Sequence, residues 1–174
     1  MIVGGFIFLE NWMIRNELSD ALPKLFVRNL KDNKEEELIL CNEKVYSPGV
    51  TEMQKDRKTD NIYIGYSSPK TNAKTYIYNI KSKEKRLVKE QIIPSGHTPE
   101  NYITERLECK SQDGRMIPLT ITRHKKTKLD GKANLLLYGY SSYGTTNSNG
   151  FASHHISLID RNIIWCVCEA RGSR

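Results

Sequence analysis

The residues with the clearest chemical potential form one short loop, YGYSSYG, at positions 138–144. The loop follows the apolar run 135–137, which is typical of a strand buried on both faces. A connection between two elements needs only a few polar residues, and three tyrosines are more than a turn requires. The loop is therefore either an ordinary surface connection or a site at the carboxyl end of a strand.

No familiar catalytic motif accompanies this loop. The chain has no G-x-S-x-G nucleophile elbow, no Walker loop and no G-x-G-x-x-G, and residues 139–143 lack the second glycine of the elbow. We expect His97 and His124 to be solvated. His154 and His155 are adjacent in a predicted helix, where neighbouring side chains point apart, so they form a poor metal pair. We therefore expect neither a metal nor a cofactor.

The four cysteines suggest reduced thiols in a cytoplasmic protein. None forms a C-x-x-C pair or sits beside a histidine at metal-ligand spacing. Cys166 and Cys168 are two positions apart in an apolar run, so in a strand they share one face. The apolar start runs into Glu10 without a preceding basic residue, which favours a strand over a signal peptide, and no segment reaches the length of a membrane span.

Up to about residue 100, short β segments alternate with polar turns. The clearest predicted pair is 62–66 with 75–80, because both runs are rich in β-branched and aromatic residues. Other candidate strands are 2–9, 25–29, 37–40 and 86–88. Strands at this spacing suit a sandwich, a barrel or propeller blades, and the pattern alone does not separate these three.

The second half has a different pattern. Residues 91–103, rich in proline and glycine, predict a linker, and 104–110 with 116–124 predict a hairpin turned at Asp113-Gly114. After the tyrosine loop, a second group of elements is expected: a helix at 151–162 that buries Ile156 and Ile159, and a buried strand at 163–168. Strand, loop, helix and strand in this order are typical of a parallel α/β sheet.

The charge of the chain is moderately basic. Lysine and arginine total 27 against 20 acidic residues, which gives a net charge of +7. The lysines are spread along the chain, often beside acids, and no interleaved aromatic and basic pattern of an RNA-binding module is present. We interpret the excess as a solvated surface and expect neither nucleic acid nor membrane as a partner.

Two segments together resemble a known family. LLLYGYSSYG at 135–144 followed by SLIDRNIIWCVCEARGSR at 157–174 resembles the prolyl oligopeptidase family, most closely its oligopeptidase B (protease II) branch. Upstream, the runs 61–91 and 102–126 resemble the last propeller strands of that family and its entry into the catalytic domain. The resemblance covers residue 40 to the end and is weaker before that.

The resemblance implies a mixed fold, in which the C-terminal strands of a β-propeller are followed by the first part of an α/β-hydrolase domain. The implied boundaries are 1–95 for the partial propeller, 96–103 for a linker and 104–174 for the truncated hydrolase portion. It also implies that Tyr140 donates its hydroxyl to the oxyanion of the tetrahedral intermediate. Gly139 would then allow close backbone approach, while Tyr138 and Tyr143 would serve packing.

The chain also departs from the family pattern. Family members usually carry glycine where Ser141 stands, and a second glycine where Ser173 stands. Their serine nucleophile, aspartate and histidine all lie downstream of the R-G-G motif, so the resemblance leaves none of the three in these 174 residues. We therefore expect an internal piece of a longer peptidase, inactive by itself.

The function implied for the parent enzyme is hydrolysis of short peptides after arginine or lysine through an acyl-enzyme. Two alternatives remain open at this point. The chain is either a non-catalytic subunit that completes a split peptidase with a separately encoded C-terminal catalytic fragment, or a β-rich binding domain whose basic surface holds anionic partners.

Overall fold

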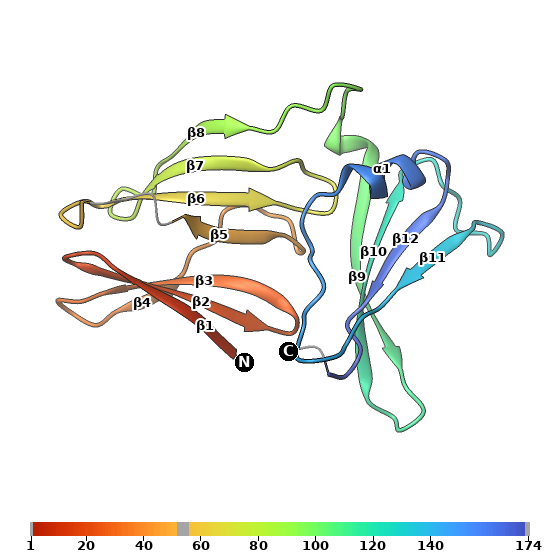
Figure 1. Ribbon diagram of the computed structural model, residues 1–174, viewed down its shortest axis with the longest axis horizontal. Helices are drawn as coiled ribbons and strands as arrows, with labels where there is room; N and C mark the ends of the chain where they lie inside the picture. Colours follow the sequence, from red (N-terminus) through yellow and green to blue (C-terminus); the bar gives the residue numbers. More distant parts are fainter. Residues whose placement is uncertain (1, 52–55, 173–174) are drawn as a thin grey trace.

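A computed structural model describes residues 2–51 and 56–172, and Ser173 and Arg174 lie outside the described residues. These ranges form three four-stranded sheets (Figure 1). Their regular structure is mostly β, with one α-helix and one short 3-10 helix. No helix within these ranges is long and apolar enough to cross a membrane.

The first two sheets are antiparallel, and each follows the order of its strands in the chain. The first contains β1 (Ile2–Phe8), β2 (Trp12–Ser19), β3 (Leu22–Asn29) and β4 (Glu35–Glu37). The second contains β5 (Ser47–Thr51), β6 (Asn61–Ser67), β7 (Lys74–Asn79) and β8 (Lys85–Glu90). The hairpins predicted between residues 62 and 88 are therefore present.

Two strands of these sheets had no clear signal in the sequence. Strand β2 lacks regular alternation because Glu17, which is 8% exposed, lies on the sheet and pairs with Arg15. Strand β5 contains Pro48 and Gly49, which ordinarily mark turns, yet an edge strand tolerates a residue without an N–H. The strand expected at 37–40 is wrong in position, since β4 ends at Glu37.

The first two sheets share one apolar core. Inward residues of β2 and β3 meet those of β6, and Ile14, Leu25, Ile62 and Ile64 are each no more than 1% exposed. Burial of such side chains contributes about 1.5–3 kcal/mol each. The two sheets are thus held face to face by packing.

The outer edge of the second sheet is β8, whose residues are all exposed. It carries Lys85, Arg86 and Lys89. Leu87 and Val88 are also exposed, at 45% and 47%.

The third sheet is mixed and follows the order β11-β12-β10-β9. Its strands are β9 (Tyr102–Lys110), β10 (Met116–His124), β11 (Leu135–Tyr138) and β12 (Ile164–Cys168). Strands β9 and β10 form the predicted hairpin, and β11 pairs in parallel with β12, also as predicted. Strand β9 begins at Tyr102, inside the range assigned to the linker, after a 3-10 helix at Pro99–Asn101.

Helix α1 (Ser153–Ile159) connects β11 to β12 and buries Ile156 and Ile159, as predicted. It is shorter than the expected 151–162. Ala152 has extended backbone before it, and Asn162, at φ 63°, turns the chain out of the helix after it. The helix packs over Trp165 and Val167 of β12, together with Tyr102.

One burial prediction is wrong. Residues 135–137 were expected to be buried on both faces, but Leu135, Leu136 and Leu137 are 53%, 38% and 61% exposed. The reason is the sheet order, which places β11 at an edge, while the buried central position goes to β12.

Candidate active site

Tyr140 lies in the loop directly after β11, at the carboxyl end of a strand that runs parallel to β12. Loops at this end of parallel strands face the crevice in which such sheets bind ligands. Tyr140 is 44% exposed, so its side chain is accessible from solvent. The position therefore suits a group that touches a ligand.

The residue before this loop is held by an aromatic stack. The ring of Tyr138 lies on that of Trp165 at 6.0 Å and 19°, and His155 of α1 stacks on Trp165 at 3.8 Å and 21°. Burial, helped by His154, lowers the pKa of His155 to about 4, so its ring is neutral near pH 7. The end of β11 is thus fixed by contacts with both β12 and α1.

The predicted packing role holds for Tyr138 and is wrong for Tyr143. Tyr143 is 95% exposed and adopts φ 56°, so its ring projects away from the sheet. The left-handed backbone at this residue turns the loop, and the side chain does not pack against the sheet.

The close backbone approach lies at Gly172 instead of Gly139. A Cβ on Gly139 would lie 3.5 Å from Cys168 Cβ, which is an ordinary contact. A Cβ on Gly172, at φ 102°, would overlap the carbonyl oxygen of Ser141. The sequence signal for this contact was the R-G motif that follows β12.

A cavity of about 440 Å³ opens beside Tyr140. Its lining combines the aromatic stack with the polar loop, and includes Tyr138, Tyr140, Asn147, His155, Leu158 and Trp165. A lining of apolar and aromatic side chains with a few polar groups is the usual composition of a small-ligand site.

A buried polar cluster holds this loop to the end of β12, and no motif in the sequence predicts it. Asn147 and Glu169 are 9% and 6% exposed, and Asn147 Nδ2 is 3.2 Å from Glu169 Oε2. Burial raises the pKa of Glu169, although the hydrogen bond from Asn147 and the charge of Arg106 oppose that shift. Burial also lowers the pKa of Arg106.

The histidines do not assemble into catalytic or metal sites. His97 was expected to be solvated, but its Nε2 lies 2.7 Å from the Lys70 carbonyl and its ring stacks on Tyr102 at 5.2 Å. His124 meets the edge of the same tyrosine at 5.7 Å. No group of three metal-ligating side chains is found in residues 2–51 and 56–172.

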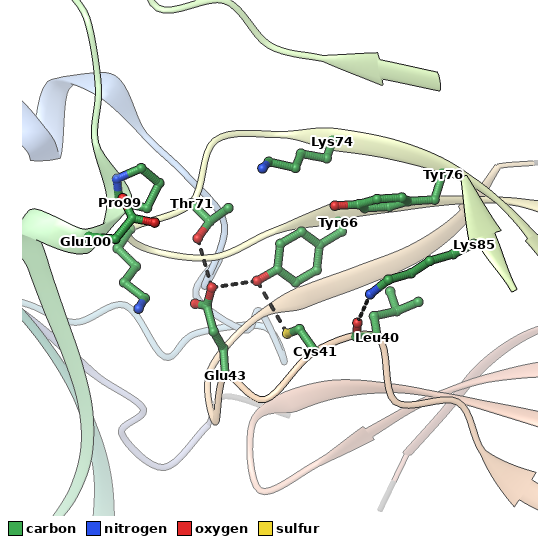
Figure 2. Close-up of a pocket in the computed structure, with 11 residues that line it drawn as sticks. Leu40, Cys41, Glu43, Tyr66, Thr71, Lys74, Tyr76, Lys85, Pro99 and Glu100 are labelled. Carbon is green, nitrogen blue, oxygen red and sulfur yellow. Dashed lines mark hydrogen bonds between the residues drawn. The ribbon is translucent and has the colours of Figure 1, made fainter. Parts of the chain in front are cut away.

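A second cavity, of about 270 Å³, lies beside the second sheet and is built around Glu43, in the segment between β4 and β5 (Figure 2). Glu43 Oε1 accepts hydrogen bonds from Tyr66 at 2.7 Å and Thr71 at 2.8 Å, and Cys41 donates to the Tyr66 oxygen at 3.4 Å. Burial is the main cause that raises the pKa of Tyr66, and its hydrogen bonds with Cys41 and Glu43 raise the pKa further. The phenol therefore stays protonated, and the cluster acts as a structural donor–acceptor network. The residues come from two stretches of the chain, Cys41 with Glu43 and Tyr66 with Thr71, and no motif links these stretches.

Comparisons with known proteins agree on one family. Over 175 aligned residues the chain is 32% identical to dipeptidyl aminopeptidase BI of Pseudoxanthomonas mexicana. This alignment covers 100% of this chain and 24% of that protein. It is 25% identical over 134 residues to protease 2 of Moraxella lacunata, covering 77% of this chain and 19% of that protein. No family model matches the chain.

Oligopeptidase B from Trypanosoma brucei shares the fold with a TM-score of 0.88 at 24% identity, over 98% of this chain and 25% of that structure. The chain belongs to the prolyl oligopeptidase family. The chain spans about a quarter of the length of dipeptidyl aminopeptidase BI and of the oligopeptidase B structure. Its mostly β architecture matches a region of that family's fold that includes propeller strands.

Proposed function

We propose that this chain forms part of an oligopeptidase B-like serine peptidase. In this proposal residues 1–95 are the last blades of the β-propeller, 96–103 the linker, and 104–174 the first portion of an α/β-hydrolase domain. Two features support the hydrolase portion: the parallel pair β11–β12 and the α1 crossover that joins these strands. The four free thiols are consistent with a reducing, cytoplasmic compartment.

The proposed reaction is hydrolysis of short peptides after arginine or lysine. When a serine nucleophile attacks the scissile carbonyl, negative charge develops on the carbonyl oxygen, and the Tyr140 hydroxyl donates a hydrogen bond to it. The observation that carries this assignment is the position of Tyr140, two residues beyond the end of β11 and beside the 440 Å³ cavity. In this proposal the serine, aspartate and histidine come from another part of the complete peptidase.

The first experiment uses the chain alone. The purified chain should neither turn over arginyl or lysyl amide substrates nor react with a fluorophosphonate probe. Stoichiometric labelling of a serine in this chain would contradict the proposal, because it would reveal a nucleophile within these residues.

The second experiment uses the complete peptidase that contains these residues. Tyr140→Phe should lower kcat by about 10²- to 10³-fold, because one oxyanion donor is lost. Tyr143→Phe is the matched control, since its ring is 95% exposed and it should leave kcat unchanged. Equal activity of wild type and Tyr140→Phe would refute the role of Tyr140.

A second candidate function is that of a non-catalytic subunit that completes a peptidase with a separately encoded catalytic fragment. The exposure of β11 favours it, because Leu135 and Leu137 remain 53% and 61% exposed in this chain. A polypeptide with the missing hydrolase strands should bind the chain and give it a cooperative thermal transition. A chain that already melts sharply and reversibly as a monomer would argue against both the subunit and the fragment.

A further inference from the structure

The segment between β11 and α1 carries Tyr140, and it is anchored first to the end of β12. Asn147 provides this anchor: its Nδ2 lies 3.3 Å from the Tyr140 carbonyl, 3.2 Å from the Cys168 carbonyl and 3.2 Å from Glu169 Oε2. The side chain is only 9% exposed, so water does not replace these bonds readily. One amide thus fixes the backbone of Tyr140 relative to β12.

The same segment is anchored a second time, to the first antiparallel sheet. Two residues after Asn147, Asn149 is 2% exposed and its Nδ2 lies 3.4 Å from the Ala21 carbonyl. In Figure 1 the segment from β11 to α1 runs between the mixed sheet and the two antiparallel sheets. A Cβ on Gly150 would lie 3.0 Å from Ser67 Oγ, so the segment also lies close against the second sheet.

The acceptor of the second anchor is an unusual turn. Asp20 and Ala21 form the two-residue loop between β2 and β3 with φ 52° and 58°, a conformation for which such hairpins normally use asparagine and glycine. Arg106 of β9 donates from Nη2 to the Asp20 carbonyl at 2.6 Å, and from Nη1 to the buried Thr120 hydroxyl at 2.7 Å. The two carbonyls of this strained turn are therefore both bound: Asn149 donates to that of Ala21, and Arg106 of β9 donates to that of Asp20.

We propose that Asn147 is a positioning residue for Tyr140, and that the bonds of Asn149 and Arg106 to the Asp20–Ala21 turn make this position depend on the docked first sheet. This inference rests on the proposed function of Tyr140. When the turn leaves its docked position, Asn149 loses its acceptor, and Asn147 alone of the two anchors still holds the loop that contains Tyr140. The oxyanion donor is therefore held most firmly while the first sheet and the mixed sheet are in contact.

The structural test places 3-fluorotyrosine at residue 140 of the full chain and follows its ¹⁹F resonance. Asn147→Ala, Asn147→Asp and Asn149→Ala should each move the resonance toward that of an unfolded peptide, because each removes a donor. Asn42→Ala, an exposed position, and Ala21→Gly, which keeps the carbonyl, should leave it in place. A second label at Tyr63 of β6 shows whether a variant has unfolded, and it should not move in any of them.

A wild-type resonance that already matches the unfolded peptide would overturn the inference. So would variants at 147 and 149 that leave the resonance unchanged. Movement of both labels in every anchor variant would show a general role in folding, which also overturns it.

The kinetic test uses the complete peptidase. Asn147→Ala should lower kcat by about 10- to 100-fold with little change in KM, because misplacement of a catalytic group acts on the chemical step. If Tyr140→Phe is fully active, the proposed function fails. If Tyr140→Phe is impaired while Asn147→Ala matches wild type, the positioning inference fails alone.

Discussion

Leu137 of β11 lies opposite Cys166 of β12 in the parallel pair, yet Leu137 is 61% exposed and Cys166 is 2% exposed. Both residues belong to the same sheet, so the difference comes from position alone: β12 has a strand on each side, and β11 has one free edge. An exposed apolar edge is a template for pairing with other chains.

We predict that this edge makes the isolated chain associate. The double substitution Leu135→Lys/Leu137→Lys should keep it monomeric at concentrations at which the wild type aggregates, because charges on one face of an edge strand oppose pairing. Light scattering and sedimentation measure this difference. Leu129→Lys is the control, since Leu129 is 62% exposed but lies outside any strand. If it prevents association equally well, the edge is not the cause.

Acid should destabilise the chain through His155. Its pKa falls from 6.5 to about 4 on folding, so the folded state binds fewer protons than the unfolded state between these values. This contribution to stability is full above about pH 6.5 and is lost as the pH falls toward 4. Urea unfolding of the complex between this chain and a polypeptide with the missing hydrolase strands, measured at several pH values, should show this decline.

In that complex, His155→Phe should flatten the decline relative to the parent chain and keep the stack on Trp165. The control is His154→Phe at the exposed neighbouring residue, which should preserve most of the decline in stability with falling pH. Identical pH profiles for the parent and His155→Phe would contradict the assignment.

The hydrogen bond between Tyr102 and Asp160 should contribute modestly to stability. The Tyr102 hydroxyl donates to Asp160 Oδ1 at 2.8 Å, and burial, with this bond to Asp160, raises the pKa of the phenol to about 12. Tyr102→Phe should cost about 1 kcal/mol of unfolding free energy, because the exposed Asp160 regains water.

Tyr63→Phe is the matched control for this measurement, because no hydrogen bond of its hydroxyl is found in the part of the chain that the structure describes. Equal losses in the two variants would show that the Tyr102–Asp160 bond adds nothing.

The cysteines should react in order of exposure. Cys109 is exposed, whereas burial raises the pKa of the Cys166 thiol and leaves it 2% exposed. A thiol reagent under native conditions should therefore label Cys109 first and Cys166 only after unfolding. Peptide mapping identifies the labelled residue, and rapid native labelling of Cys166 would show that β12 opens.

The sequence predicts local pairing well and burial less well. The hairpins of β6–β7 and β9–β10 follow from alternation and turn residues, and the parallel β11–β12 pair follows from the strand, helix and strand pattern. The exposure of β11 does not follow, because it depends on where the crossover places the strand in the sheet.

The candidate site shows the same division. Tyr140 was found through a motif, because its loop is contiguous in sequence. The anchors Asn147 and Asn149 were missed because all but one of their acceptors are backbone carbonyls, at Tyr140, Cys168 and Ala21, and the exception is the Glu169 carboxylate. A carbonyl is present at every residue, so no side-chain pattern identifies the one that is used.

The exposed basic strand β8 and the leucine-rich strand β11 are two sheet edges of different character. Lys85, Arg86 and Lys89 lie on the outer edge of the second sheet, and charged side chains on an edge strand oppose pairing with a further strand. At the opposite end, β11 offers leucines and an open hydrogen-bonding edge. The β11 edge of the mixed sheet is therefore better suited to accept a further strand than the β8 edge of the second sheet.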